Sequence, residues 1–138
     1  MKYNNIWLNL PVKDASISRN FYQKIGFTLN NRYGNNETSS SFFIGEHNLV
    51  LMLFQQDLFS SFVATDISQL NYSNEVLFSL SAESKTEVDQ MVDLVETAGG
   101  GIYSSPREAQ GWMYGMGFAD PDGHKWNLLF MDFEKLNG

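Results

Sequence analysis

The chain has 138 residues, of which 43% are hydrophobic and 14% aromatic, and 9 Lys and Arg against 16 Asp and Glu give a formal net charge of −7. This is the length of one domain with enough apolar surface for a packed core, which excludes general disorder. The acidic balance argues against nucleic acid as a partner, because binding it requires clustered Lys and Arg. With no cysteine and only two histidines, disulfides, iron–sulfur clusters and cysteine-ligated zinc are excluded.

No segment of the sequence approaches the roughly 20 consecutive apolar residues of a membrane helix. The first residues, Met1 to Asn5, lack the charged region, apolar run and cleavage site of a signal peptide. We therefore expect a cytoplasmic protein with no membrane association.

The first half of the chain predicts one strand, one helix and three further strands. Residues 5–12 alternate between two faces, which indicates a strand. Asp14 can cap a helix whose apolar residues recur every four positions, and Gly26 ends this helix by allowing a left-handed backbone. The three further strands are expected at residues 27–32, 41–44 and 49–54.

Residues 56–73 do not continue this pattern. Apolar side chains at Leu58, Phe59, Phe62 and Val63 indicate a short amphipathic helix or a hydrophobic flap. We interpret this segment as the connection between two halves.

The second half repeats the order of the first. Residues 75–81 alternate as a strand, and Ser84 with Glu87 forms a capping box for a helix that stops at the glycine run beginning at Gly99. Further strands are expected near residues 102–103, at 112–119, and from 124 or 125 to 131. Both halves therefore have the order β-α-β-β-β, which indicates duplication of one module in an α+β fold. We expect a single domain, residues 1–138, with module one at about 5–55 and module two at about 74–132.

Several motifs occur in the order and spacing of a known family. Pro11-Val12-Lys13-Asp14, followed by Phe21-Tyr22 and Gly26-Phe27, resembles the start of vicinal oxygen chelate proteins, the superfamily of glyoxalases, bleomycin-resistance proteins and extradiol dioxygenases. Asp120-Pro121-Asp122-Gly123-His124 resembles the last hairpin of the same family. The resemblance covers nearly the whole chain. It implies two modules that form a cupped mixed sheet, a ligand site on the concave face, and a homodimer.

The resemblance also implies where four strands of the family carry metal ligands, which are typically His or Glu. Carried over by spacing, these positions are Trp7, Met52, Glu75 and Asn127. Trp and Met are not ligands for a hard divalent ion, and one carboxylate cannot replace the hydration shell of such an ion efficiently. We therefore expect no metal at the inherited position and no cofactor.

The two histidines do not fall on these four positions. His47 lies in a predicted hairpin turn and His124 follows a predicted turn. Both are expected in turns or on the surface, and neither completes a metal site.

Strand periodicity places some of the candidate binding residues on the faces away from the helices, but it does not decide the face of Met52, because both faces of residues 49–54 are apolar. Trp7 and Asn9 oppose the helix-packing residues of the first strand, and Leu77 does so in the strand at 75–81. The predicted ligand-binding residues are Trp7, Asn9, Met52, Leu77, Trp112, Tyr114, Asn127 and Leu129. Two alternatives remain open: the aromatic residues form ordinary core or dimer contacts, and Trp7 fills the space of a lost metal without any chemistry.

Glu75 is the candidate catalytic residue. In a hydrophobic cup without a cation, burial would raise the pKa of Glu75 toward the range of a proton-transfer base. The alternative is a partly exposed glutamate at the start of a strand.

The resemblance and the degenerate ligand set together predict a glyoxalase-like protein that binds a small hydrophobic or aromatic molecule. The alternative is a lyase or isomerase of the glyoxalase type, similar to lactoylglutathione lyases, that uses an unexpected metal or Glu75 as its base. A third interpretation is a structural or regulatory dimer in which the cup has collapsed.

Overall fold

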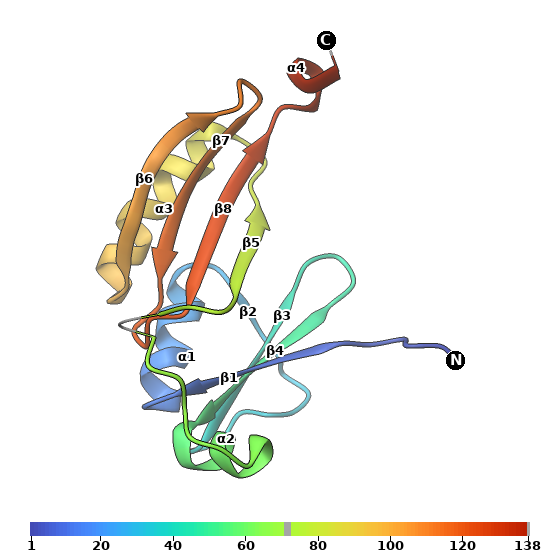
Figure 1. Ribbon diagram of the computed structural model, residues 1–138, viewed down its shortest axis with the longest axis vertical. Helices are drawn as coiled ribbons and strands as arrows, with labels where there is room; N and C mark the ends of the chain where they lie inside the picture. The colour runs from blue at the N-terminus through green and yellow to red at the C-terminus, as the bar shows by residue number, and fades with distance from the viewer. Residues whose placement is uncertain (71–72, 138) are drawn as a thin grey trace. The chain divides into compact units, whose positions relative to one another are not determined.

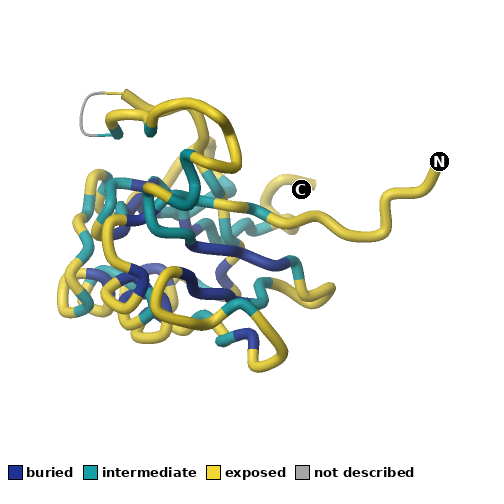
Figure 2. Tube along the Cα trace, turned by 90° about the horizontal axis from the view of Figure 1, so that it is seen from below, coloured by how far each residue is buried: buried dark blue, intermediate teal, exposed yellow. Residues whose placement is uncertain are grey.

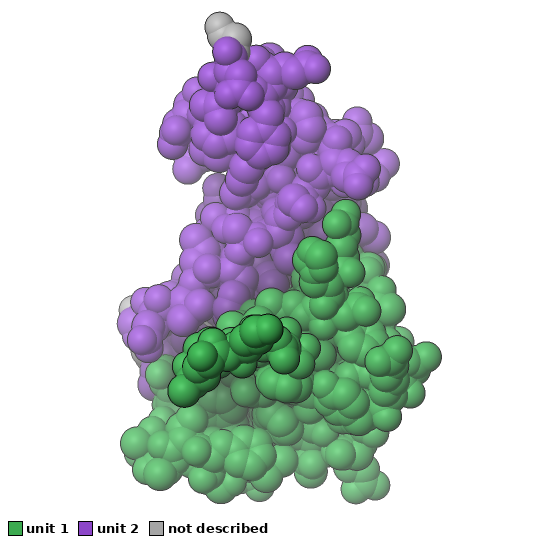
Figure 3. Space-filling view, turned by 90° about the vertical axis from the view of Figure 1, so that its right-hand side faces the viewer, with its two compact units in different colours: residues 1–68 green, residues 69–138 purple. Residues whose placement is uncertain are grey.

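The computed structural model describes residues 1–70 and 73–137, and the chain divides into two compact units, residues 1–68 and residues 69–138 (Figures 1 and 3). Each unit contains one of the two predicted modules. The predicted connecting segment 56–73 contributes to both units, and its residues 71 and 72 lie outside the described residues. Within the described part of the chain, no helix is long and apolar enough to cross a membrane.

Unit 1 contains β1 (Trp7–Val12), α1 (Ala15–Lys24), β2 (Thr28–Leu29), β3 (Ser39–Ile44), β4 (Leu49–Gln55) and α2 (Gln56–Val63). Its strands form a mixed sheet in the order β1-β4-β3-β2, in which β1 and β4 run parallel and the other neighbours run antiparallel. The segment predicted as a short helix or flap is therefore the helix α2 in its first part.

Unit 2 contains β5 (Leu77–Ser81), α3 (Lys85–Ala98), β6 (Gly101–Ala109), β7 (Met113–Ala119), β8 (Lys125–Met131) and α4 (Phe133–Asn137). Its sheet has the order β5-β8-β7-β6, again with one parallel pair, β5 and β8. The two units thus share one topology. This confirms the α+β class, the mixed sheets and the duplicated β-α-β-β-β order.

Helix α1 packs on one face of the unit 1 sheet and begins where the sequence predicts. The Asp14 carboxylate accepts hydrogen bonds from the backbone N–H groups of Ser16 (2.9 Å) and Ile17 (3.1 Å), which have no partner inside the helix. Tyr22 is fully buried, and its ring centroid lies 5.8 Å from that of Phe42 in β3. The apolar stripe of the helix and the sheet thus form one core.

Helix α3 packs on one face of the unit 2 sheet. The Ser84 hydroxyl accepts from the Glu87 N–H (3.2 Å), while the Glu87 carboxylate accepts from the N–H of Glu83 rather than of Ser84 (2.7 Å). This is the predicted capping box with the return bond moved by one residue. Trp126 is buried in the core, where its ring stacks on Phe118 with centroids 6.4 Å apart. In Figure 2 the segment before β1 is exposed, in contrast to buried stretches in the strands.

Two strands differ in length from the prediction. β2 is much shorter than the predicted 27–32, because the Asn30 side chain accepts the Arg32 N–H (2.9 Å) and turns the chain out of the sheet. β6 is much longer than the predicted strand near residues 102–103, because two register shifts let it stay paired with β7 past Pro106.

Candidate functional site

Helix α3 covers one face of the unit 2 sheet (Figure 1). A groove of about 760 Å³ lies on the other face, and we call it the unit 2 groove. All four strands of the sheet contribute to it. Its lining comprises Leu77, Tyr103, Ser104, Ser105, Pro106, Arg107, Ala109, Met113, Gly115, Met116, Asn127 and Leu129. This volume is in the usual range of small-molecule pockets, which is about 300–1,000 Å³.

Two glycines in the middle of β7 let side chains of the neighbouring strands lie close against the unit 2 sheet. A Cβ atom at Gly117 would stand 2.5 Å from Cε2 and 2.8 Å from Oη of Tyr103. A Cβ atom at Gly115 would stand 3.1 Å from the carbonyl oxygen of Leu128 and would collide with the side chain of Leu129. The side chain of Leu129 therefore occupies the space over Gly115, and the ring of Tyr103 occupies the space over Gly117.

Tyr103 and Asn127 form a polar pair in the lining of this groove. The Tyr103 hydroxyl donates to Oδ1 of Asn127 (2.7 Å) and lies 3.2 Å from the carbonyl oxygen of Trp126. Lys125 places its Nζ 5.4 Å from the centroid of the Tyr103 ring. Burial raises the pKa of Tyr103 above 10.0, so the hydroxyl keeps its proton and acts as a donor at neutral pH.

Register shifts in β6 bring its polar residues onto the groove face. Tyr103 and Ser104 are consecutive, and strict alternation would place them on opposite faces of the sheet. The first shift, between Ile102 and Ser104, instead pairs Ser104 with Gly117, which Tyr103 also contacts. The second shift pairs Arg107 with Gly115, so that Arg107 also lines the groove.

Three of the predicted binding residues of unit 2 line this groove. Leu77, Asn127 and Leu129 do so, and Leu77 keeps 52% of its surface exposed. An apolar side chain that remains half exposed on a sheet face is available for contact with another molecule. Ligand binding by these three residues stays a prediction.

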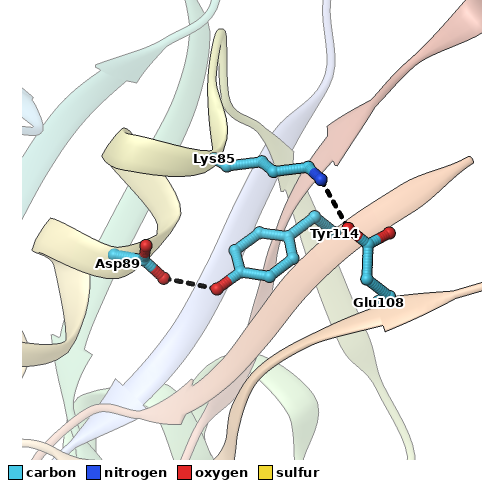
Figure 4. A network of polar contacts seen from close by, with 4 residues as sticks. All are labelled: Lys85, Asp89, Glu108 and Tyr114. Atoms are coloured by element: carbon cyan, nitrogen blue, oxygen red, sulfur yellow. Dashed lines mark hydrogen bonds and ion pairs between the residues drawn. The ribbon is translucent and has the colours of Figure 1, made fainter.

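Tyr114 does not have its predicted position. It lies on the α3 side of the sheet, where its hydroxyl donates to Asp89 of α3 (2.6 Å) and Lys85 lies 5.5 Å from its ring centroid (Figure 4). Lys85 is also paired with Glu108. β7 alternates regularly here, so Tyr114 must oppose its neighbour Gly115, which faces the groove.

Glu75 and Trp112 also lie outside the groove lining. Glu75 is exposed and precedes β5, so the expected burial in a hydrophobic cup is not found within the described structure. Trp112 precedes β7 and packs on Phe133 of α4, with ring centroids 6.2 Å apart. The alternative interpretations of a partly exposed glutamate and an ordinary aromatic contact fit these positions.

Unit 1 has a smaller groove of about 380 Å³, which we call the unit 1 groove. Trp7 lines it, and the Trp7 indole N–H donates to the hydroxyl of Tyr33 (2.9 Å), another lining residue. Met52 is buried instead, because the chain crosses over it at Gly34, where a Cβ atom would stand 2.9 Å from the Met52 methyl carbon. Asn9 is exposed and lines neither groove.

The sequence and the fold were compared with those of known proteins. The model of the Glyoxalase/Bleomycin resistance protein/Dioxygenase superfamily matches residues 6–128. The chain belongs to this superfamily. No curated protein matches the sequence at a significant level.

Solved structures of the superfamily have the same fold. The hypothetical protein SA1046 from S. aureus is 32% identical, with a TM-score of 0.82 over 94% of this chain and 95% of that one. A glyoxalase-related enzyme from Fulvimarina pelagi is 19% identical, with a TM-score of 0.78 over 90% and 85% of the two chains. A lactoylglutathione lyase from Agrobacterium tumefaciens is 16% identical, with a TM-score of 0.66 over 93% of each chain. At the last two identities the likeness shows the fold alone.

The four residues that the resemblance implies at the metal positions of the superfamily do not fit a divalent ion. Met52 is packed beneath Gly34, and the side-chain oxygen of Asn127 accepts the hydroxyl proton of Tyr103. Trp7 has no oxygen or imidazole donor, and Glu75 is exposed before its strand. Over residues 1–70 and 73–137 there is no group of three or more His, Cys, Asp and Glu side chains placed to hold a metal.

His47 lies in a turn, and His124 follows the turn at residues 121–122, as predicted. His47 is exposed between β3 and β4 and lines the unit 1 groove. His124 lies between β7 and β8, but it is buried rather than on the surface, and its backbone N–H donates to Asp120 (2.9 Å).

Tyr103 and Arg107 are among the groove residues that the sequence of this glyoxalase-superfamily protein does not predict. A cue was present in the alternating glycines 115 and 117, because glycines inside a strand often mark a place where another group approaches the backbone. The register shifts that direct β6 toward this place have no comparable signature in the sequence.

Proposed function

We propose that this protein binds a small molecule with an apolar body in the unit 2 groove, without the superfamily's metal centre. The observation that carries the proposal is the unit 2 groove itself, which is lined by apolar Leu77 and Leu129 and by the hydrogen-bonded pair Tyr103–Asn127. Pockets with mostly apolar walls and a few oriented polar groups are typical of small-molecule sites.

The two kinds of lining residue have distinct roles in the proposal. Leu77 and Leu129 supply the favourable free energy of removing apolar surface from water, at roughly 25 cal/mol per Å². Tyr103 and Asn127 orient the ligand, because each keeps hydrogen-bonding capacity beyond the bond between them. Binding would therefore depend on Leu77 for affinity and on the polar pair for selectivity.

A neutral fluorescent probe, N-phenyl-1-naphthylamine, tests the proposal with the full chain. We expect saturable binding that Leu77→Asn weakens several-fold. Val76→Asn is the matched control, because Val76 is also 52% exposed and adjacent, but does not line the groove. An equal loss of probe affinity in the two variants would contradict the proposal. NMR chemical-shift changes that the probe causes only in backbone amides of unit 1 would also contradict it.

A separate measurement tests the proposal that the protein binds its ligand without a metal ion. We expect probe affinity to be the same with and without a chelator, and no stoichiometric divalent ion in elemental analysis of the purified protein. A bound ion lost in Glu75→Ala would overturn this part and favour the alternative of a lyase or isomerase. Catalytic turnover abolished by Glu75→Gln would favour the metal-free form of that alternative.

We further propose that the protein forms a homodimer. Ile6 and Trp7 are consecutive and each keep about half or more of their surface exposed, which is unusual for neighbouring large apolar side chains. Light scattering coupled to size exclusion would contradict this proposal if the mass remained near the 15.7 kDa of one chain at all concentrations.

A further inference from the structure

The net charge of the protein resides entirely in unit 2. Residues 69–138 contain four Lys and Arg and eleven Asp and Glu, which gives −7, whereas residues 1–68 contain five of each kind. A multiply charged anion is therefore repelled from the unit that contains the larger groove.

Arg107 is nevertheless the one charged residue in the lining of the unit 2 groove. Its side chain is exposed, and no residue in the described parts of the chain forms an ion pair with its guanidinium. The neighbouring Glu108 does not neutralise it, because Glu108 pairs with Tyr114 in the ladder and its carboxylate binds Lys85 on the α3 side. Lys125, the other cation near the groove, lies over the Tyr103 ring.

The sheet register places Arg107 at a defined distance from the polar pair. Arg107, Gly115 and Leu129 form one row across β6, β7 and β8, and Ser104, Gly117 and Asn127 form the next row. Neighbouring rows on one face are two residues apart, or about 7 Å. This is about the width of one aromatic ring. The side chain of Leu129 covers Gly115 and the ring of Tyr103 covers Gly117, so Arg107 and the Tyr103–Asn127 pair lie about one ring width apart along the groove.

We propose that the groove ligand is a small organic monoanion, whose anionic group binds Arg107 while its apolar body lies along the groove against Leu129 and Leu77. This rests on the proposed function and specifies the ligand class of the same groove. A guanidinium with a planar fork of donors suits a carboxylate, which it can bind with two parallel hydrogen bonds. The acidic surroundings favour one localised negative charge over a polyanion.

A matched pair of probes, 2-naphthoate and 2-naphthamide, tests the inference, because the two have nearly the same shape and differ in charge. In the full chain at 0.15 M salt, we expect 2-naphthoate to bind more tightly by roughly tenfold to a hundredfold, the usual worth of a hydrogen bond to a charged group. Arg107→Gln should remove that preference and leave 2-naphthamide unaffected, and Arg107→Lys should retain part of it. Arg32→Gln is the control, because it removes one positive charge from the lining of the unit 1 groove instead.

The outcomes separate the inference from the proposed function. If 2-naphthamide binds the wild type as tightly as 2-naphthoate, the monoanion class is wrong while binding in the groove stands. If Arg32→Gln rather than Arg107→Gln removes the preference, the anion binds in unit 1 and the inference is overturned. If neither these probes nor N-phenyl-1-naphthylamine binds, the proposed function itself is wrong.

Discussion

Replacing Gly117 by alanine would move Tyr103 without disrupting the sheet around it. The added methyl group would stand 2.5 Å from Cε2 of Tyr103, and this collision is with the far end of a side chain that is 45% exposed. Tyr103 can rotate toward solvent, at the cost of its hydrogen bond to Asn127. Losing one such bond costs a net of about 0.5–1.5 kcal/mol. Replacing glycine by alanine inside a strand returns roughly 0.5–1 kcal/mol, so the free energy of unfolding should change by less than about 1 kcal/mol.

Gly115→Ala is the matched comparison on the same strand. There the methyl group would stand 3.1 Å from the backbone carbonyl of Leu128, which is part of the ladder and cannot swing away. Overpacking of this kind typically costs about 1–3 kcal/mol. Urea denaturation of both variants should therefore rank Gly115→Ala as the more destabilising substitution.

A second measurement follows the position of Tyr103 directly. Burial raises the pKa of Tyr103 above 10.0, so displacement toward water in Gly117→Ala should bring that pKa back toward 10.0. The ¹³Cζ signal of Tyr103, assigned with Tyr103→Phe, reports this titration. An unchanged pKa, or equal destabilisation by the two alanine variants, would refute the account of how the groove is formed.

Three further predictions concern stability. Asn30→Ala should lower the free energy of unfolding by about 1–3 kcal/mol in urea denaturation, because Asn30 is fully buried and its amide donates to a buried serine hydroxyl (2.9 Å). The hydrogen bond to Asp89 raises the pKa of Tyr114 above 10.0. The contribution of this hydrogen bond to stability is therefore complete below pH 10 and is lost as the pH rises through the raised pKa. Tyr114→Phe should flatten the fall in the thermal unfolding midpoint at alkaline pH. Hydrogen bonding to Lys85 lowers the pKa of Glu108 below 4.5. The contribution of this pair to stability is therefore present above pH 4.5 and is lost as the pH falls through the lowered pKa. Glu108→Gln should make the thermal unfolding midpoint less sensitive to acid, and high salt should have the same effect as this substitution.

Each of these predictions has a result that contradicts it. An Asn30→Ala protein as stable as the wild type would show that the buried amide bond is readily replaced. An alkaline profile unchanged by Tyr114→Phe, or an acid profile unchanged by Glu108→Gln, would mean that the contacts drawn in Figure 4 do not persist in solution.

The sequence predicts the elements of this fold well where one face of an element is buried. The alternation in residues 5–12 and the stripe after Asp14 directly encode burial on one side, so β1 and α1 appear where expected. The prediction is wrong where side chains direct the backbone through specific contacts. Asn30 ends β2 by bonding the Arg32 N–H, and no periodicity in the sequence indicates this.

The candidate site is less well predicted, for a related reason. Leu77, Asn127 and Leu129 lie in regular strands, so parity places them correctly on the groove face. The aromatic character of Tyr114 suggests a lining role. Because Tyr114 is next to Gly115 in a regular strand, strand alternation instead places it on the opposite face, where it binds Asp89 of α3. An aromatic side chain can serve a core, a surface or a pocket equally well, and only its neighbours decide which.

The sequence by itself determines the duplicated module, the α+β class and the small number of His and Cys residues that could bind a metal, because these follow from periodicity and from which residue types are present. Only the tertiary structure decides which residues meet in the groove. The register shifts of β6 bring Tyr103 and Arg107 to the face where Gly115 and Gly117 leave room. Register depends on pairing between distant strands, so it cannot be deduced from any one strand alone.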